Sequence, residues 1–256
     1  MSHKLHDISL YYPEGADIKV RRTFNKKAKV ISDLYVHYLN SYKPPKTTRV
    51  SVELGRPEIK LIGFAGSVLC LNYPFDAKQY WELSNHEQNQ YLLAITHEVG
   101  VLCCKEFNWD LNVFNAAHQR VIEANFVYEV ELKQKLSKDK KIKACLIVNK
   151  IEGCAIISAG FFNKEGRMLK KVELFRAQQH ETFYGHALKK HKWIHDHYGI
   201  TGCDEEVQIL ASPYSDERVV KFYPNKHSQR KLEKFVNFLT YKEINTSEEF
   251  EAWLKE

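Results

Sequence analysis

The chain has 256 residues, of which 44% are hydrophobic and 12% aromatic. This composition excludes a disordered chain, because disordered segments lack the aromatic and branched residues that offset the entropy of ordering. Residues 1–19 have no apolar segment of signal-peptide length, and no run elsewhere approaches the roughly 20 apolar residues of a membrane helix. The formal net charge of +6 is mildly basic. We therefore expect a globular cytoplasmic protein with no membrane partner.

The cysteines are irregularly spaced, and no pair has the CxxC spacing of a redox or zinc motif. We expect them to be reduced thiols, as is usual for a chain of this length in a reducing compartment. Cys103 and Cys104 lie on an apolar helical face, where core packing is a better interpretation than nucleophilic catalysis. The six cysteines are Cys70, Cys103, Cys104, Cys145, Cys154 and Cys203.

The first third of the chain alternates short strands with one helix. A helix is predicted over residues 28–42, which Pro44 and Pro45 end. Gly55-Arg56-Pro57 and Ala65-Gly66 mark turns between neighbouring strands. Short strands are predicted over residues 8–12, 50–54, 58–64 and 67–73.

A helical hairpin follows. Ser84 and Glu87 fit a capping box, in which each side chain satisfies an amide of the first turn. Asn108 and Trp109 end this helix, and Asp110 can cap a second one. The apolar face of the first helix is predicted to comprise Leu92, Ile95, Val99 and Leu102, and that of the second Phe114, Ala117, Val121 and Ile122.

The hydrophobic period then changes from helix to strand. Residues 126–133 alternate apolar and polar side chains, as a strand with one wet face does. Short turns separate it from further strands over residues 142–148, 155–162 and 168–175, which predicts an antiparallel meander. Two more short strands are expected near residues 207–211 and 218–222. Terminal helices are expected around residues 232–239 and 246–254, the second with a Thr246–Glu249 capping box.

These elements predict an α+β fold, in which a helical hairpin packs with an antiparallel β-meander and C-terminal helices. We expect one α+β domain over residues 1–256. A sub-boundary near residue 125 could divide a mixed front part, 1–125, from a back part, 126–256, that carries the meander and the terminal helices.

Standard catalytic motifs are missing from the sequence. His97-Glu98-Val99-Gly100-Val101 begins like the zinc motif HExxH, but Val101 stands where the second histidine should be. The sequence contains no phosphate-binding loop, dinucleotide fingerprint or GxSxG elbow. We therefore expect no cofactor and favour a protein that is not an enzyme.

A histidine-rich stretch over residues 180–197 is the one unusual constellation. His191 and His195 have the HxxxH spacing that stacks two imidazoles on one helix face. His195 and His197 have the HxH spacing of a strand face, and the two spacings cannot both be realised. His191, His195 and Asp196 are candidate metal ligands. The alternative, which we favour, is a polar surface segment with solvent-facing histidines.

Two lysine-rich blocks account for much of the positive charge. They could attract phosphates or an acidic partner surface, but a solvated face is favoured because aromatic residues are sparse among them. The first block comprises Lys19, Arg21, Arg22, Lys26, Lys27 and Lys29. The second comprises Lys133, Lys135, Lys138, Lys140, Lys141 and Lys143.

A patterned chain without catalytic signatures is similar in general style to the immunity proteins that accompany bacterial toxins, although no diagnostic residue carries this likeness. It implies a non-enzymatic cytoplasmic module that docks one protein partner. An inhibitor of a nucleic-acid-cutting toxin would tend to be acidic, so this basic chain suits a partner with an acidic surface. The alternatives are a metal-assisted hydrolase or nuclease that uses the His180–His197 stretch, and a nucleic-acid-binding module without chemistry.

Overall fold

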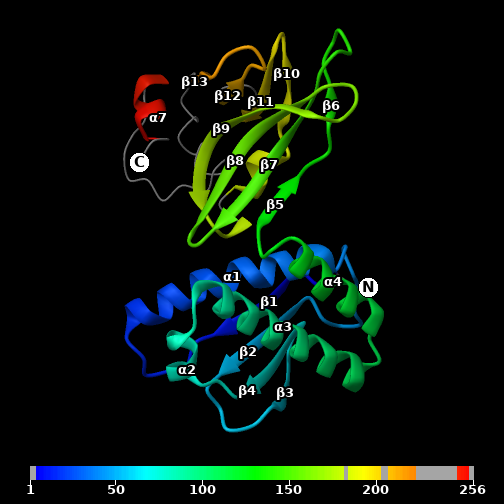
Figure 1. Cartoon of the computed structure of the whole chain (residues 1–256), viewed down its shortest axis with the longest axis vertical. Coiled ribbons are helices and arrows are strands. Elements are labelled where there is room, and N and C mark those ends of the chain that lie inside the picture. Colours follow the sequence, from blue (N-terminus) through cyan, green and yellow to red (C-terminus); the bar gives the residue numbers. More distant parts are fainter. Residues whose placement is uncertain (1–3, 182–183, 203–206, 223–246, 254–256) are drawn as a thin grey trace. The chain divides into compact units, whose positions relative to one another are not determined.

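The computed structural model describes residues 4–181, 184–202, 207–222 and 247–253. The chain divides into two compact units, Met1–Tyr128 (unit 1) and Glu129–Glu256 (unit 2). The division lies close to the sub-boundary expected near residue 125, and the organisation as one domain stays a prediction. Helices and mainly antiparallel strands follow one another along the chain (Figure 1), which confirms the α+β class. None of the described helices is long and apolar enough to cross a lipid bilayer.

Unit 1 contains a mixed sheet in the order β1-β2-β4-β3. β1, β2 and β4 run parallel, whereas β3 is antiparallel to β4. The strands are β1 (Asp7–Tyr11), β2 (Arg49–Leu54), β3 (Lys60–Ala65) and β4 (Val68–Tyr73). Their positions follow the sequence prediction, which left their pairing open. β1 and β2 are parallel and α1 lies between them in the chain, so that β1-α1-β2 is a βαβ unit.

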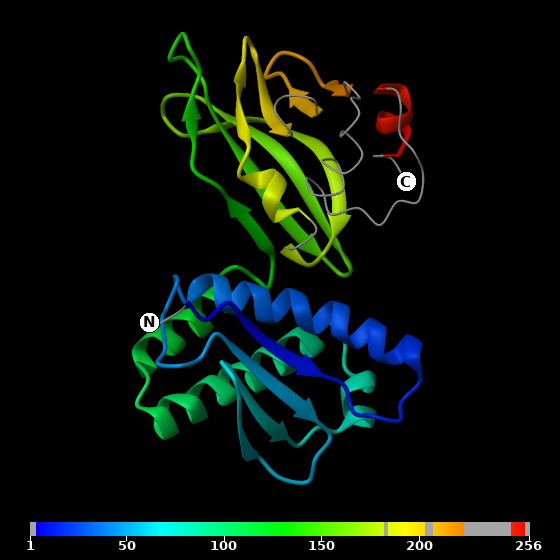
Figure 2. The same cartoon turned by 180° about the vertical axis from the view of Figure 1, so that it is seen from behind.

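The helices of unit 1 are α1 (Ile18–Tyr38), α2 (Ala77–Glu82), α3 (Asn85–Phe107) and α4 (Leu111–Glu123). α3 and α4 form the expected hairpin and lie over one face of the sheet, and no described helix covers the other face (Figures 1 and 2). The capping box is confirmed, since the Ser84 amide donates to the Glu87 carboxylate at 2.8 Å. Asn108 ends α3 in the left-handed region with φ 55°.

α1 begins at Ile18, well before the predicted residue 28. The Asp17 carboxylate caps it by accepting a hydrogen bond from the Lys19 amide at 2.7 Å. Apolar residues are sparse in the first turns, so the periodicity did not reveal them. The first lysine block is therefore helical, and part of it is structural. Lys27 is buried and donates to Gln88 at 2.7 Å, and Lys29 pairs with Asp7 at 3.4 Å.

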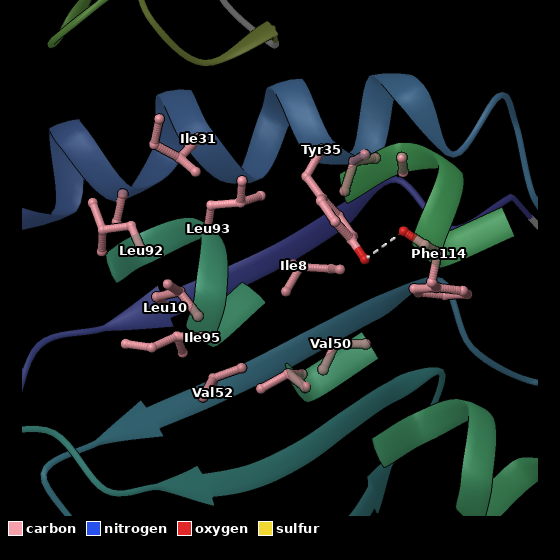
Figure 3. Packing of buried hydrophobic residues seen from close by; sticks show 14 of the residues in the cluster. Ile8, Leu10, Ile31, Tyr35, Val50, Val52, Leu92, Leu93, Ile95 and Phe114 are labelled. Atoms are coloured by element: carbon pink, nitrogen blue, oxygen red, sulfur yellow. Dashed lines mark hydrogen bonds between the residues drawn. The ribbon is translucent and has the colours of Figure 1, made fainter. Parts of the chain in front are cut away.

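The core of unit 1 lies between the helices and the sheet. Figure 3 shows side chains of α1, α3 and the strands pointing into one interior. The predicted face of α3 is largely right, because Leu92, Ile95 and Val99 are buried, although Leu102 is partly exposed. In α4 the predicted face is right except for Ile122, which is 45% exposed.

Three helices meet closely at Gly100 of α3. The Tyr35 hydroxyl of α1 donates to the Phe114 carbonyl of α4 at 3.2 Å (Figure 3). A Cβ atom at residue 100 would lie 2.5 Å from the Phe114 ring and 3.3 Å from the Tyr35 hydroxyl. Only glycine permits this approach, because the buried ring has no room to move away.

Unit 2 contains two antiparallel sheets. The first has the order β5-β7-β8-β9, with β6 paired to β7, and the second has the order β10-β11-β12-β13. The first-sheet strands are β5 (Tyr128–Glu131), β6 (Lys135–Leu136), β7 (Lys143–Ile151), β8 (Cys154–Phe162) and β9 (Met168–Gln178). The second-sheet strands are β10 (His191–Ile194), β11 (His197–Gly202), β12 (Val207–Ala211) and β13 (Arg218–Phe222).

The antiparallel meander is confirmed, as are the two strands expected near residues 207–211 and 218–222 and a helix within the expected residues 246–254. The C-terminal part as a whole is not helical as expected. The described residues after the meander are mostly strands, with two short helices, α5 (Gly185–Leu188) and α7 (Ser247–Trp253). β10 and β11 were not predicted because their sequences, HKWI and HYGITG, do not alternate apolar and polar residues. The expected helix at residues 232–239 lies outside the described residues, as does Thr246 of the second capping box. The helical hairpin belongs to unit 1 and packs on the sheet of that unit.

We predict that Gly100→Ala lowers the free energy of unfolding. Alanine favours a helix by about 1 kcal/mol over glycine, but overpacking a filled core costs about 1 to 3 kcal/mol. The net loss should be about 1 kcal/mol in urea denaturation. A Phe114→Leu background, which removes the ring that the new Cβ would meet, should abolish this loss. Stabilisation by Gly100→Ala in the wild-type background would contradict the packing described for the three helices.

Candidate binding site at the hairpin turns of unit 2

Three turns of unit 2 gather at the same end of its sheets (Figures 1 and 2). They are the β6–β7 turn, the β10–β11 turn and the beginning of the β12–β13 connection. Together they surround a pocket of about 160 Å³. The pocket is lined by Ser137, Lys138, Asp139, Ile142, Trp193, His195, Asp196, Pro213 and Tyr214. We call this group of turns and their pocket the hairpin-turn site.

The β6–β7 turn is held by hydrogen bonds of its own residues. The Ser137 amide donates to the Ile142 carbonyl at 2.8 Å, which closes the turn. The Asp139 carboxylate accepts from the Ser137 hydroxyl at 2.7 Å and from the Lys141 amide at 3.2 Å. Short polar side chains commonly stabilise turns in this way. The turn therefore presents its lysines from a fixed backbone.

The β10–β11 turn has only two residues, His195 and Asp196. Ile194 pairs with His197 across the hairpin, so these two residues form the whole loop. His195 has φ 53°, in the left-handed region that short hairpin loops require and that histidine adopts more readily than most residues. The Asp196 carboxylate lies 2.7 Å from the His197 Nδ1 atom.

Two hydrogen bonds link β6 to β10. The Trp193 Nε1 atom donates to the Lys135 carbonyl at 3.0 Å, and the Lys135 ammonium donates to the His191 carbonyl. The indole ring also packs against Tyr198, with ring centroids 5.4 Å apart, and against Phe161 at 5.9 Å. These contacts hold the first two turns in a defined spacing at the pocket.

The pocket combines apolar walls with a charged rim. Ile142, Trp193 and Pro213 supply apolar surface, and the Tyr214 side chain stands 72% exposed beside them. Lys138, Lys140 and Lys141, which belong to the second lysine block, are exposed on the β6–β7 turn. This surface can contact an apolar group at its centre and carboxylates around it.

The two carboxylates that line the pocket, those of Asp139 and Asp196, are hydrogen-bonded within their own hairpins. Hydrogen bonding to Ser137 is the main reason why the pKa of Asp139 is lowered. Hydrogen bonding to His197 has the same effect on the pKa of Asp196. Both groups are thus ionised near neutral pH and already engaged with donors of the same turns.

The size of the pocket limits what can enter it. Pockets for drug-sized ligands and cofactors measure about 300 to 1,000 Å³, whereas an apolar cavity of about 150 Å³ holds one benzene molecule. At about 160 Å³ the hairpin-turn pocket matches a single ring or branched side chain.

The structure separates the three candidate metal ligands. His195 and Asp196 line the pocket, but His191 begins β10, and its Nδ1 atom is hydrogen-bonded to the Tyr198 hydroxyl. The HxxxH spacing does not lie on a helix, and the HxH spacing spans the turn. No group of three or more His, Cys, Asp or Glu side chains could hold a metal ion within the described part of the chain. A metal site at these residues stays a prediction.

His191 is held as a neutral imidazole. Burial, together with the nearby positive charge of Lys135, lowers its pKa from 6.5 to about 4. A protonated ring would lie in a poorly solvated place beside another cation. His191 therefore serves the packing of β10 rather than the open pocket.

A second histidine pair lies in unit 1. The rings of His97 and His118 are stacked, with centroids 4.3 Å apart and planes at 30°. The His97 Nδ1 atom is hydrogen-bonded to the Tyr35 hydroxyl at 2.9 Å. Lone pairs in the planes of stacked rings do not converge at metal-ligand distance, about 2.0 to 2.1 Å from each nitrogen. This pair therefore has packing geometry and not chelating geometry.

Cys103 and Cys104 are unsuited to act as nucleophiles. Burial raises the pKa of Cys103 to about 12 and that of Cys104 to about 11, so both are protonated thiols. The prediction that they pack in the core is confirmed, since both are buried. All five described cysteines are free, and Cys203 lies outside the described residues.

Sequence reasoning found His195, Asp196 and the lysines of this site but missed its apolar residues. Ile142 and Trp193 carry no motif, and Pro213-Tyr214 is a plain turn dipeptide until the strands around it are placed. A scan of protein-family models and searches of curated proteins and of solved structures find no match to this chain. The site must therefore be interpreted from its own geometry.

We predict that acidification destabilises unit 2 through His191. Its pKa is lower in the folded chain than the ordinary 6.5, so the unfolded chain binds the proton first. The free energy of unfolding should fall as the pH decreases from 6.5 toward 4 and level off below that for this group. His191→Gln should show a smaller fall in urea denaturation. A His191 ring that titrates near 6.5 in an NMR pH titration would contradict the burial described.

Proposed function

We propose that the chain is a non-enzymatic recognition module that docks one protein partner with an acidic surface at the hairpin-turn site. The observation that carries the proposal is the convergence of three turns around a single-side-chain pocket beside an exposed tyrosine. Loops held by a rigid sheet are a common platform for recognition, because the scaffold sets their positions in advance.

The aromatic residues support protein recognition. Tyrosine and tryptophan are enriched at protein interfaces and among the residues that contribute most binding energy. Tyr214 is 72% exposed, and a tyrosine exposed to this extent gains apolar burial when a partner covers it. Trp193 is held by its bond to Lys135, so little conformational entropy would be lost on binding.

The lysines support an acidic partner. Lys138, Lys140 and Lys141 are exposed around one turn, and opposite charges across an interface mainly raise the association rate and specificity. In unit 1, by contrast, Lys27 and Lys29 of the first block are engaged in internal contacts. The exposed lysines of the second block lie on the β6–β7 turn, which lines the pocket.

The alternatives have less support. A metal-assisted hydrolase needs a ligand set, and none is found among the described residues. A nucleic-acid-binding surface uses successive aromatic platforms along a basic groove, whereas this site has one exposed tyrosine and a small pocket. An immunity-type protein in the bacterial cytoplasm, which inhibits a toxin by covering it, is one instance of the proposed function.

The test is photo-crosslinking in the native cells from position 214. We expect the Tyr214→p-benzoylphenylalanine protein to form one discrete adduct with an acidic protein. Binding of that purified protein, measured by calorimetry, should weaken about tenfold or more in a Lys138→Glu, Lys140→Glu, Lys141→Glu triple variant, since each rim charge contributes up to about 1 kcal/mol.

A triple variant of exposed lysines in unit 1, Lys60→Glu, Lys78→Glu and Lys105→Glu, makes the same change of net charge. It should bind the partner as the wild type does. Equal loss in both triple variants, or an adduct that consists of nucleic acid, would overturn the proposal of a specific protein site.

A further inference from the structure

We propose that the hairpin-turn pocket takes one apolar side chain of the partner, with a carboxylate of the same segment placed against Lys138. This inference rests on the proposed function and names the chemistry of the anchor. It follows from the volume of the pocket, the nature of its walls and the state of its charged groups.

The walls and the volume define an apolar anchor. Ile142 is buried at the base of the β6–β7 turn, and the lining also includes Trp193 of β10 and Pro213 of the β12–β13 connection. A volume of about 160 Å³ admits one phenyl or branched aliphatic group. Burial of such a side chain contributes about 1.5 to 3 kcal/mol, so a single anchor of this kind can act as a hot spot.

Lys138 supplies a positive charge at the pocket that a carboxylate of the partner can pair with. It lines the pocket, its side chain is exposed, and it makes no hydrogen bond or ion pair with any described residue. A partner carboxylate beside the anchor would reach this ammonium without displacing an existing bond. Such pairs at the rim of an interface favour one orientation of the incoming segment.

A cationic anchor is the competing possibility, because aromatic rings and carboxylates can together hold an ammonium or guanidinium group. Two observations disfavour it. The Asp139 carboxylate accepts from Ser137 and already lies 3.9 Å from the Lys141 ammonium, and the Asp196 carboxylate lies 2.7 Å from the His197 ring. In addition, the charge of Lys138 at the pocket would repel a cation.

The experiment uses three small probes with the full chain and follows amide chemical shifts. 3-Phenylpropionate carries a ring and a carboxylate, 3-phenylpropylamine carries a ring and a cation, and propionate carries only the carboxylate. We expect millimolar binding of 3-phenylpropionate with shifts in all three turns. The other two probes should bind at least about threefold more weakly, since each lacks one of the two interactions.

Three variants separate the contribution of the ring from that of the charge. Lys138→Met should remove the preference for 3-phenylpropionate over the amine, whereas Lys140→Met, on the same turn but outside the pocket lining, should retain it. Tyr214→Ala should weaken both ring-bearing probes and leave propionate unchanged. Both lysines and the tyrosine are exposed, so these variants should fold.

Several results would overturn the anchor. Stronger binding of the amine would show a cationic anchor, and equal binding of propionate would show that no ring enters the pocket. Failure of every probe to bind the wild-type chain would also reject it. None of these results would reject the proposed function. That function is tested separately by the crosslink at position 214 and by the two triple lysine variants.

Discussion

The link between β6 and β10 is the interaction on which the candidate site depends. β6 has only two residues and pairs only with β7, so its own sheet holds it weakly. The Trp193 Nε1 and Lys135 ammonium bonds join it to the second sheet. Each bond contributes about 0.5 to 1.5 kcal/mol, which is small for the domain but large for a two-residue strand. The link thereby sets the spacing of two of the three turns.

The same link explains the distribution of charge around it. The Lys135 ammonium donates a hydrogen bond to the His191 carbonyl. Burial of the His191 imidazole, together with the positive charge of Lys135, lowers the pKa of His191 and keeps the ring neutral. Lys138, Lys140 and Lys141 remain outside. A block that is uniform in sequence is thus divided into lysines that bond to backbone carbonyls, Lys135 and Lys143, and a group that a partner can reach. Lys27 and Lys29 show the same division in unit 1, where internal acceptors take up part of the first block.

Local signals made much of the fold predictable. The Ser84–Glu87 capping box and the end of the helix at Asn108 are encoded within a few residues, and both are found as predicted. Elements that depend on distant contacts were not predictable in the same way. β10 is stabilised by Trp193, which packs against Phe161 of the first sheet and against Tyr198 of β11, and the parallel pairing of β1 with β2 depends on a partner some 40 residues away.

The candidate site shows the same limit. His195 and Asp196 were selected for their side-chain chemistry, yet their two-residue turn assigns them a backbone role as well. The apolar residues Ile142, Trp193 and Tyr214 become a site only when three hairpins bring them together. A pattern within one segment cannot reveal a pocket built from three segments. For this reason the function follows from the convergence of the turns rather than from any motif.

The most direct test of this account is the Lys135→Met variant, which keeps the apolar stem and loses the ammonium that bonds to the His191 carbonyl. Lys135 does not line the pocket. We predict weaker binding of 3-phenylpropionate and a rise in the His191 pKa in NMR titrations. Lys143→Met is the matched control, because it removes a similar lysine bond, to the Lys164 carbonyl at 3.2 Å, and should change neither quantity. Unchanged probe affinity in Lys135→Met would contradict the claim that this link builds the site.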